Sequence, residues 1–387
     1  MQDHSPFESG TETSSAEVPT KDYARQYAAL VPGLLEDIAE TLLNDKPILG
    51  KAVQKFEAAF ATAMGARHCV GLNSGTDALV LGMLQAGIGP GDEVITQANT
   101  FLATVSAIRM VGATPVLVDC LTHSPALNPD ALSAAWSPRS RALLVVHMHG
   151  FATPMTPLVK FAEDYDLLLM EDCAQAHGAL DELGKPVGTR GTFGAFSFHP
   201  SKNLGAFGDA GAFICMDEEM AAGVRVLRNL GKEGKYEQTR LGWNSKLDTL
   251  QATILLRRLP ELAANNRRRR MLARRYDQGL ADLSGLELPQ AAARTTAVFH
   301  HYPVLHAKRD MLRAHLAQHG IGSSLHYPIP PHLQTAAKEL GLGVGSFPQT
   351  ERRAARGLSL PMASELREDE IDRVIAVVRG FCMEEGA

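Results

Sequence analysis

Short apolar segments alternate with helical patterns between residues 68 and 171, and this rhythm constrains the fold of the chain more than any other feature. The apolar segments cover 68–71, 93–97, 114–119, 141–147 and 166–171, and the stretches between them have apolar residues at helical spacing. Strands that alternate with helices form parallel sheets buried on both faces. The sequence therefore predicts an α/β fold with a mostly parallel central sheet flanked by helices.

Further elements are predicted on both sides of this region. Helical spacing predicts covering helices over 22–64, a helix over 217–229 and a long helix over 250–280 that breaks at Pro260. Two more strands, 195–198 and 210–215, are joined by a Gly-rich loop. After residue 284 the pattern changes to a strand over 298–305, a helix over 308–319 and a Pro-rich stretch over 327–331. We expect a disordered extension (1–19), a large α/β domain with the N-terminal helices and the long connecting helix (20–283), and a small C-terminal α+β domain (284–387).

Composition excludes several classes of protein. The formal net charge is −5, and no run of 18 apolar residues is present, so neither nucleic acid binding nor a membrane span is indicated. The five cysteines form no Cys-x-x-Cys pair, and the first twenty residues lack the pattern of a signal peptide. We expect a cytoplasmic protein without a metal site. The arginines of 267–270, with Arg274 and Arg275, are predicted to form a solvated or subunit-facing surface on the long helix.

A possible anion site lies where the first predicted strand ends and a helix begins. The small residues Ser74, Gly75 and Thr76 occupy this junction. Backbone N–H groups at a helix N-terminus, together with the helix dipole, hold a phosphate well. The alternative is a simple Ser/Thr N-cap without a ligand.

A carboxylate, Asp172, follows another buried strand. Ligands of parallel α/β sheets bind outside the carboxyl ends of the strands, so Asp172 is a candidate charge partner for a ligand. Alternatively, Asp172 caps the segment that follows it. His177, five residues further on, is either a structural or a catalytic histidine.

A lysine, Lys202, lies among aromatic and small residues in a segment with few charges. Such surroundings favour the neutral, nucleophilic amine, which forms Schiff bases, although a lone lysine is usually a surface residue. Pyridoxal 5′-phosphate (PLP) requires a phosphate site, a carboxylate for its pyridine nitrogen and a lysine for its aldehyde. The three features together predict a PLP site.

Four long motifs of the sequence resemble motifs of the DegT/DnrJ/EryC1/StrS family of sugar aminotransferases. They are Gly-Leu-Asn-Ser-Gly-Thr-Asp-Ala-Leu (71–79), Gly-Pro-Gly-Asp-Glu-Val-Ile (89–95), Glu-Asp-Cys-Ala-Gln-Ala-His-Gly-Ala (171–179) and Ser-Phe-His-Pro-Ser-Lys-Asn-Leu-Gly-Ala-Phe-Gly-Asp-Ala-Gly (197–211). The resemblance runs from about residue 19 to the C-terminus. It implies the fold type I architecture of aspartate-aminotransferase-like enzymes and a homodimer with shared active sites.

The resemblance assigns expected roles to individual residues. It makes Lys202 the catalytic Schiff-base lysine, and a histidine there would instead indicate a dehydratase branch of the family. The expected cofactor contacts are Ser74, Gly75, Thr76 and Ser197 at the phosphate, Phe101 stacked on the ring, Asp172 at the ring nitrogen, Gln175 beside the ring, and Asn244, which reaches the phosphate of the neighbouring subunit.

The substrate contacts implied by the resemblance are His199, Lys246, His326, Tyr327 and His332. Lys246 replaces an arginine that the family commonly has, and a lysine receives a carboxylate as a point charge, without a bidentate fork. The stretch 326–334 resembles a loop of members that aminate C3 of nucleotide-linked 3-keto sugars. A rigid Pro-rich loop without substrate contact is the alternative.

The expected activity is an amino transfer from L-glutamate to C3 of a nucleotide-linked 3-keto-6-deoxyhexose. The expected nucleotide is dTDP. PLP would serve as cofactor and pyridoxamine phosphate as its intermediate form in a ping-pong scheme. The alternatives are an aminotransferase for a 4-keto sugar or a keto-cyclitol and, more remotely, a non-catalytic PLP-binding regulator.

Overall fold

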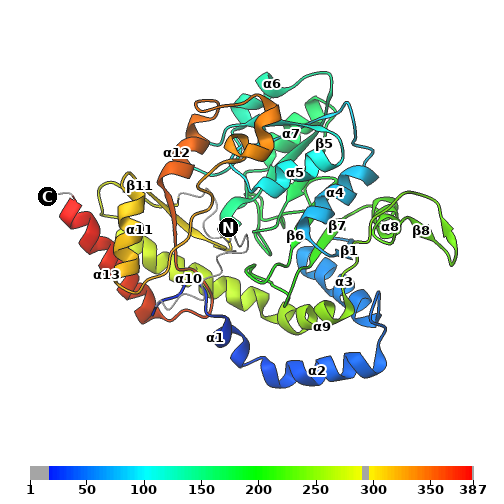
Figure 1. Cartoon of the computed structure of the whole chain (residues 1–387), viewed down its shortest axis with the longest axis horizontal. Helices are drawn as coiled ribbons and strands as arrows, with labels where there is room; N and C mark the ends of the chain where they lie inside the picture. The colour runs from blue at the N-terminus through cyan, green and yellow to red at the C-terminus, as the bar shows by residue number, and fades with distance from the viewer. Residues whose placement is uncertain (1–16, 290–295, 386–387) are drawn as a thin grey trace, which may run out of the picture.

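The computed structural model describes residues 17–289 and 296–385, and its centre is a seven-stranded sheet (Figure 1). The strands lie in the order β1-β7-β6-β5-β4-β2-β3. Their bounds are β1 (His68–Leu72), β2 (Glu93–Gln97), β3 (Thr114–Val118), β4 (Ser140–Val146), β5 (Leu168–Asp172), β6 (Phe193–Ser197) and β7 (Gly211–Cys215). β7 pairs antiparallel with both β1 and β6, and the other pairs are parallel. The predicted, mostly parallel sheet is confirmed.

Helices cover both faces of this sheet because successive strand residues point to opposite sides. Leu144 packs with α4 (Gly75–Gln85), α5 (Leu102–Met110) and α8 (Glu218–Leu227) on one face. Leu143 and Val145 pack with α6 (Leu132–Ala135) and α7 (Thr156–Asp164) on the other. There, α3 (Lys51–Met64) and α9 (Thr249–Arg258) cover the side chains of β1, β6 and β7. Burial on both faces explains why the strands read as continuous apolar runs.

A second, smaller sheet lies towards the C-terminus, with strands β10 (Leu286–Glu287), β11 (Tyr302–His306) and β12 (Gly357–Leu360). It packs with α10 (Leu262–Leu280), α11 (Arg309–Gln318) and α13 (Glu368–Glu385) around its own apolar core. The helix α10 belongs to both parts, since Leu262 packs against the large sheet and Tyr276 against the small one. The predicted domain boundary after residue 283 stays a prediction.

The predicted helices are confirmed, with small differences. The region 22–64 contains α1 (Tyr23–Ala28), α2 (Val31–Asn44) and α3, and Gly65 ends α3 in the left-handed conformation expected of a C-cap. Pro260 lies in a 3₁₀ turn, η3 (Leu259–Glu261), that joins α9 directly to α10. The proline therefore interrupts the helical hydrogen bonds without reversing the chain.

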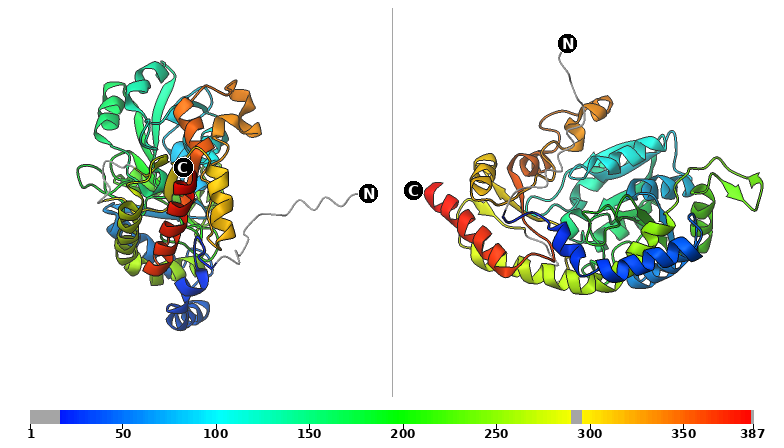
Figure 2. Two further views of the ribbon diagram at one scale, coloured as in Figure 1. Left: turned by 90° about the vertical axis from the view of Figure 1, so that its left-hand side faces the viewer. Right: turned by 60° about the horizontal axis from the view of Figure 1, so that its bottom comes forward.

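Several elements were not predicted, among them the strands β10 and β12 and the C-terminal helix α13. A hairpin of β8 (Lys232–Glu233) and β9 (Glu237–Gln238) projects from the body of the molecule in Figure 1 and in the right-hand view of Figure 2. The helix α12 (Pro348–Arg356) leads into β12. No helix in the described part of the chain combines the length and apolar character that crossing a bilayer requires.

Two expectations are corrected. The disordered extension falls largely on residues 1–16, which lie outside the described residues, but Val18 is 1% exposed and pairs with Ile321. The arginine cluster is solvated only in part: Arg267 and Arg274 are exposed, but Arg269 is buried and donates to the carbonyls of Phe299 and Met362, and Arg275 pairs with Asp372 on α13. A basic run on a helix cannot reveal that another segment packs over it.

Candidate active site

The predicted cofactor residues gather at the carboxyl ends of the parallel strands. Ser74 follows β1, Phe101 follows β2, Asp172 ends β5 and Ser197 ends β6, while Lys202 lies in the loop between β6 and β7. This edge of an α/β sheet is where ligands bind.

The helix α4 begins in a geometry suited to a phosphate. The Ser74 side chain accepts from the backbone N–H of Asp77 at 3.1 Å, so Ser74 is the N-cap of α4. The first N–H groups of a helix have no acceptor inside it. The bonds to Ser74 satisfy Asp77 and Ala78, and the N–H groups of Gly75 and Thr76 are left to face a ligand. The N-cap interpretation and the anion site are therefore compatible.

Close packing fixes the start of α4 against the neighbouring strands. A Cβ atom at Gly75 would lie 2.9 Å from the Cβ of Ser197, and one at Gly211 would overlap the carbonyl carbon of Ser74. Glycine is needed at both positions because two backbones approach each other here. The approach also places the Ser197 side chain beside the N-terminus of α4.

Asp172 is a buried carboxylate held by two donors. Its Oδ2 accepts from the Thr104 hydroxyl at 2.8 Å, and its Oδ1 accepts from the backbone N–H of Ala174 at 3.1 Å. Burial raises the pKa of Asp172, while these bonds and the nearby Lys202 ammonium oppose the rise. A carboxylate in this position is stabilised further by a ligand that brings a positively charged N–H.

A second buried carboxylate, Glu171, supports the turn behind Asp172. It accepts from His147 Nε2 at 3.0 Å and from the backbone N–H groups of Gly188, Arg190 and Gly191. His147 Nδ1 in turn accepts from the N–H of Thr153 at 3.1 Å. His147, Glu171 and Cys173 lie close enough together to suggest a metal site, but the Glu171 and His147 atoms are already engaged in this structural network.

Lys202 is half-buried, and desolvation lowers its pKa to about 8, against the opposing effect of Asp172. With this pKa about a tenth of the amine is neutral at pH 7, far more than for an ordinary lysine, and the neutral amine is the nucleophile. Another lysine, Lys21, was not predicted; burial lowers its pKa well below the usual value, and the Lys202 and Arg269 charges add to this effect.

Aromatic and amide groups complete the site. The rings of Phe101 and Tyr327 lie 5.0 Å apart, and Phe101 is 52% exposed, so one ring face is accessible to a planar ligand. Gln175 Nε2 donates to the Tyr327 hydroxyl at 3.1 Å. The rings of His326 and His301 stack at 3.6 Å. The structure thus brings Phe101, Gln175, His326 and Tyr327 together.

Two of the expected substrate contacts occupy different environments. His332 is buried, hydrogen-bonds to Glu351 at 3.1 Å and packs against Phe347, so its expected contact with the substrate stays a prediction. The partner Glu351 is remote in sequence from the motif, and no local pattern indicates it. His199 is exposed, and its Nδ1 hydrogen-bonds to the Ser201 hydroxyl at 2.9 Å.

The segment 244–246 lies beside the start of α4. The Ser245 hydroxyl donates to Asn73 Oδ1 at 3.1 Å. Asn244 is exposed and accepts a hydrogen bond from Lys246 Nζ. In a single chain, therefore, Asn244 and Lys246 bind each other near the expected phosphate site.

The sequence prediction missed Thr104, which lies in the first turn of α5 and bonds to Asp172. Its position just after β2 and the Asn-Thr-Phe segment offered a signal, because the helix that follows a parallel strand begins at the ligand-binding edge. His177 is buried against Phe196 and Phe198, and burial lowers its pKa to about 3. Neither ring nitrogen of His177 has a hydrogen-bond partner among the described residues, so the choice between a structural and a catalytic role stays open.

A family model for the DegT/DnrJ/EryC1/StrS aminotransferase family matches residues 32–379. The chain belongs to this family. The match extends over the large sheet, the small sheet and most of α13, so this aminotransferase-family chain contains the fold type I architecture as one continuous unit.

Relatives and solved structures of this aminotransferase family are similar over nearly the whole chain. A dTDP-3-amino-3,4,6-trideoxy-alpha-D-glucose transaminase from Streptomyces venezuelae is 42% identical, covering 94% of this chain and 95% of the relative. A UDP-N-acetyl-3-dehydro-alpha-D-glucosamine 3-aminotransferase from Acidithiobacillus ferrooxidans is 41% identical, and the match covers 95% of this chain and 98% of the relative. The crystal structure of S. venezuelae DesV, at 42% identity, has a TM-score of 0.92 and covers 94% of this chain and 98% of that one. The structure of NtdA from Bacillus subtilis with bound pyridoxamine phosphate (PMP) has a TM-score of 0.84 at 30% identity. The match covers 95% of this chain and 86% of that one.

The residues present fit PLP. The start of α4 offers N–H groups to a phosphate, Asp172 offers a carboxylate to a ring nitrogen, and Lys202 offers an amine of lowered pKa. The close contacts at Gly75 and Gly211 fix the turn that leads into α4.

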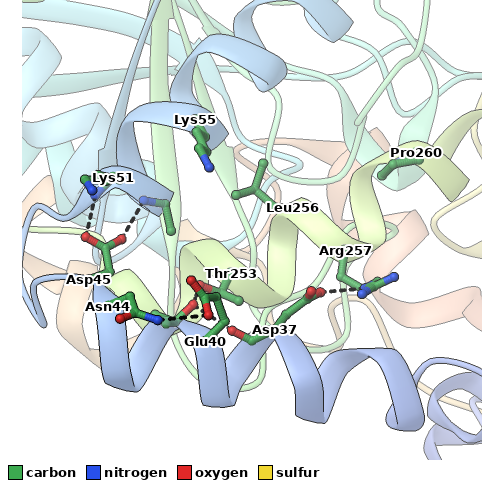
Figure 3. Close-up of a pocket in the computed structure, with 12 residues that line it drawn as sticks. Asp37, Glu40, Asn44, Asp45, Lys51, Lys55, Thr253, Leu256, Arg257 and Pro260 are labelled. Atoms are coloured by element: carbon green, nitrogen blue, oxygen red, sulfur yellow. Dashed lines mark hydrogen bonds and ion pairs between the residues drawn. The ribbon is translucent and has the colours of Figure 1, made fainter.

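A separate groove of about 490 Å³ lies between α2, α3 and α9 (Figure 3). Arg257 bonds to Asp37 at 2.6 Å, and Asn44 bonds to Glu40 at 2.9 Å. The groove is lined by none of the predicted site residues, and we assign it no role in the reaction.

Proposed function

We propose that this chain is a PLP-dependent aminotransferase that transfers an amino group from L-glutamate to C3 of a dTDP-linked 3-keto-6-deoxyhexose. The observation that carries the proposal is the meeting of Lys202, Asp172 and the α4 N-terminus at one edge of the sheet. The similarity to transaminases acting at C3 of nucleotide sugars supports the position of the new amine.

In this proposal the phosphate of PLP lies on the N–H groups of Gly75 and Thr76, beside the Ser74 and Ser197 hydroxyls. Phe101, which is half exposed, would stack on the ring, and Gln175, which bonds to Tyr327, would border it. When bound, PLP supplies an electron sink that stabilises negative charge on the carbon next to the reacting nitrogen.

Lys202 has two roles. Its amine, with a pKa of about 8, would hold the cofactor through the aldehyde between turnovers. With the donor bound, Lys202 Nζ would accept the proton of the donor α-carbon and hold it for return within the site. The same atom moves the proton in the opposite direction when the keto sugar accepts the amino group.

Asp172 keeps a positive N–H on the ring. Burial alone would favour its protonated form, but the Thr104 and Ala174 donors and a cationic ring nitrogen together favour the carboxylate. A neutral residue in its place would leave the ring nitrogen unprotonated and weaken the electron sink.

The active site is shared across a homodimer in this proposal, with Asn244 reaching the partner's phosphate site. Large apolar side chains near the hairpin support an interface here: Tyr236 is 81% exposed and Leu241 94%. Lys246, next to Asn244, is the proposed receptor of the donor carboxylate, which it meets as a point charge. The five described cysteines are all free, which suits a reducing cytoplasm.

The nucleotide and the sugar carbon are the parts of this proposal that the experiment must test. Purified enzyme and L-glutamate are incubated with one candidate acceptor at a time. The acceptors are 3-keto and 4-keto sugars linked to dTDP or UDP, and a keto-cyclitol. Products are identified by mass spectrometry and NMR. We expect amination of the dTDP-3-keto sugar. Preferential amination of another member of the panel would replace the substrate, and no amination of any member would favour the regulatory alternative.

A further inference from the structure

Three histidine rings from separate segments meet beside the proposed sugar contacts. His149 lies in η2 (Met148–Gly150), His301 lies just before β11, and His326 lies in the loop before η4 (Pro331–Leu333). The Nδ1 atoms of His149 and His301 are 3.2 Å apart. The rings of His301 and His326 stack with centroids 3.6 Å apart and an interplanar angle of 14°. The Nδ1 atom of His326 also hydrogen-bonds to the Ser359 hydroxyl on β12 at 2.9 Å.

These contacts continue into Gln175 and Tyr327. The backbone N–H of His149 donates to Gln175 Oε1 at 2.6 Å, and Gln175 Nε2 donates to the Tyr327 hydroxyl at 3.1 Å. Because Tyr327 directly follows His326 in the chain, the five residues His149, Gln175, Tyr327, His326 and His301 form a closed network. A closed network restricts the orientation of each member more than a single hydrogen bond does.

The backbone of His149 is in the left-handed region, with φ of 59°. A residue other than glycine rarely adopts this conformation, and it persists where surrounding contacts hold it. Three contacts hold it here: the ring bond to His301, the hydrogen bond that the backbone N–H of His301 donates to the His149 carbonyl at 3.3 Å, and the close packing of the next residue, Gly150, where a Cβ atom would lie 2.8 Å from the backbone nitrogen of His300. The direction of the His149 N–H, and thus the orientation of the Gln175 amide, depends on this conformation.

The rings are neutral. Burial lowers the pKa of His149 and of His326 to about 3, and burial lowers the pKa of His301 well below its usual value. The nearby charges of Lys21, Lys202 and Arg353 act in the same direction on members of the group. Two neutral imidazoles can share one proton between their Nδ1 atoms and can stack without repulsion between like charges.

We propose that His149 and His301 are positioning residues, which hold the amide of Gln175 and, with it, the hydroxyl of Tyr327 that the keto sugar meets. The inference rests on the proposed function, in which Tyr327 contacts the sugar. The two histidines act through Gln175 and Tyr327: His149 through its backbone N–H, and His301 through the rings on either side of it.

Substitutions at position 149 separate this role from simple packing. Glycine and asparagine tolerate the left-handed conformation, whereas valine does not. We expect kcat/KM for the keto sugar to fall by at least about 30-fold in His149→Val and by less than about fivefold in His149→Gly and His149→Asn. Thermal unfolding of each variant shows whether the fold is retained. Equal losses in all three variants at retained folding would overturn the proposal.

A double-mutant cycle with Tyr327→Phe tests the route of the effect. If His149 acts through the Tyr327 hydroxyl, His149→Val costs much less once that hydroxyl is absent, so the two losses are not multiplicative. Losses that multiply in the double variant would overturn the proposal. His301→Phe, which keeps an aromatic ring on His326 but loses the Nδ1 bond, is expected to show the same coupling.

The same cycle is measured without turnover, as the dissociation constant of dTDP-glucose from cofactor-free protein by calorimetry. We expect His149→Val to weaken binding in the wild-type background and to have little effect beside Tyr327→Phe. An independent effect of each substitution would contradict the positioning role. If the wild-type enzyme binds dTDP-glucose with this coupling but aminates no keto sugar, the proposed function fails while the positioning role stands. A wild-type protein that does not bind dTDP-glucose overturns the assignment of dTDP, and the kcat/KM cycle with the preferred keto sugar then decides the positioning role.

Discussion

Thr104 donates a 2.8 Å hydrogen bond to Asp172, although 68 residues separate them in the chain. The bond joins the first turn of α5, which follows β2, to the end of β5, two strands away in the sheet. Thr100, which hydrogen-bonds to Thr104 at 2.8 Å, extends the link. The carboxylate is therefore oriented by the helix that also carries Phe101 at its N-cap.

The first prediction compares Asp172→Asn with Thr104→Val. We expect Asp172→Asn to lower kcat by at least about 100-fold, because the amide cannot hold a positive charge on the ring nitrogen. Thr104→Val removes one donor and keeps the carboxylate, so a loss of about tenfold is expected. Steady-state kinetics at saturating PLP measure both. Equal losses would mean that the charge of Asp172 has no special role.

Replacement of Lys202 tests the catalytic base. Lys202→Ala should abolish turnover and leave the far-ultraviolet circular dichroism spectrum unchanged, since the side chain is not part of an apolar core. Lys21→Met is a suitable comparison, because Lys21 is the other lysine of lowered pKa beside the site and is not expected to move the proton. Normal turnover by Lys202→Ala would refute the proposed chemistry.

The pKa of Lys202 also predicts a pH dependence of stability. Its folded value of about 8 lies below the ordinary value of 10.5, so the buried charge destabilises the cofactor-free fold below pH 8, and the effect declines as the pH rises towards 10.5. We expect Lys202→Met to raise the melting temperature of cofactor-free protein by about 3 °C at pH 7 and by progressively less above pH 8. Calorimetry across this range measures the effect. A gain that stays constant up to pH 10 would contradict the lowered pKa.

The glycine contacts predict a defect in cofactor binding. Gly211→Ala places a methyl group against the backbone of Ser74, so it should displace the start of α4 and weaken PLP binding by at least about tenfold. Gly380→Ala is the matched control, because a Cβ atom there meets nothing within 4 Å and alanine favours a helix. Fluorescence titration with PLP distinguishes them. An unchanged affinity in Gly211→Ala would argue against a phosphate at this turn.

Two arginines of the helix α10 are expected to contribute unequally to the free energy of unfolding. Arg269→Met leaves the buried carbonyls of Phe299 and Met362 without a donor, so the free energy of unfolding should fall by about 3 kcal/mol. Arg274→Met, at an exposed position of the same helix, should change it by less than about 0.5 kcal/mol. Urea unfolding of both variants measures the difference. Similar values would mean that Arg269 does not link the small sheet to α10.

The sequence was most informative for polar residues that lie at the end of a predicted strand or directly after it. Asp172 and Ser74 could be placed because the carboxyl ends of parallel strands meet at one edge, and Ser197 followed from the family resemblance; the structure brings all three to that edge. Their roles, and that of Lys202, stay predictions. Contacts between distant segments could not be predicted: Thr104 with Asp172, His332 with Glu351, and Arg269 with Met362 each depend on packing that no local pattern encodes.

The histidine network illustrates the same limit. His326 was predicted from a motif, but His149 and His301 join it across the sheet edge, and the left-handed backbone of His149 has no signal in the Met-His-Gly segment beyond the following glycine. The domain boundary was similarly obscured, because one helix, α10, contributes to both cores.

The most direct test of the central claim is the visible absorption spectrum of the purified protein with PLP, recorded before and after L-glutamate and then after each nucleotide keto sugar. The account predicts that the band of protein-linked PLP forms, is bleached by L-glutamate and returns on addition of a dTDP-3-keto sugar. A band that L-glutamate leaves unchanged would contradict the assigned donor and direct attention to Lys246. A protein that forms no such band would contradict the PLP site itself.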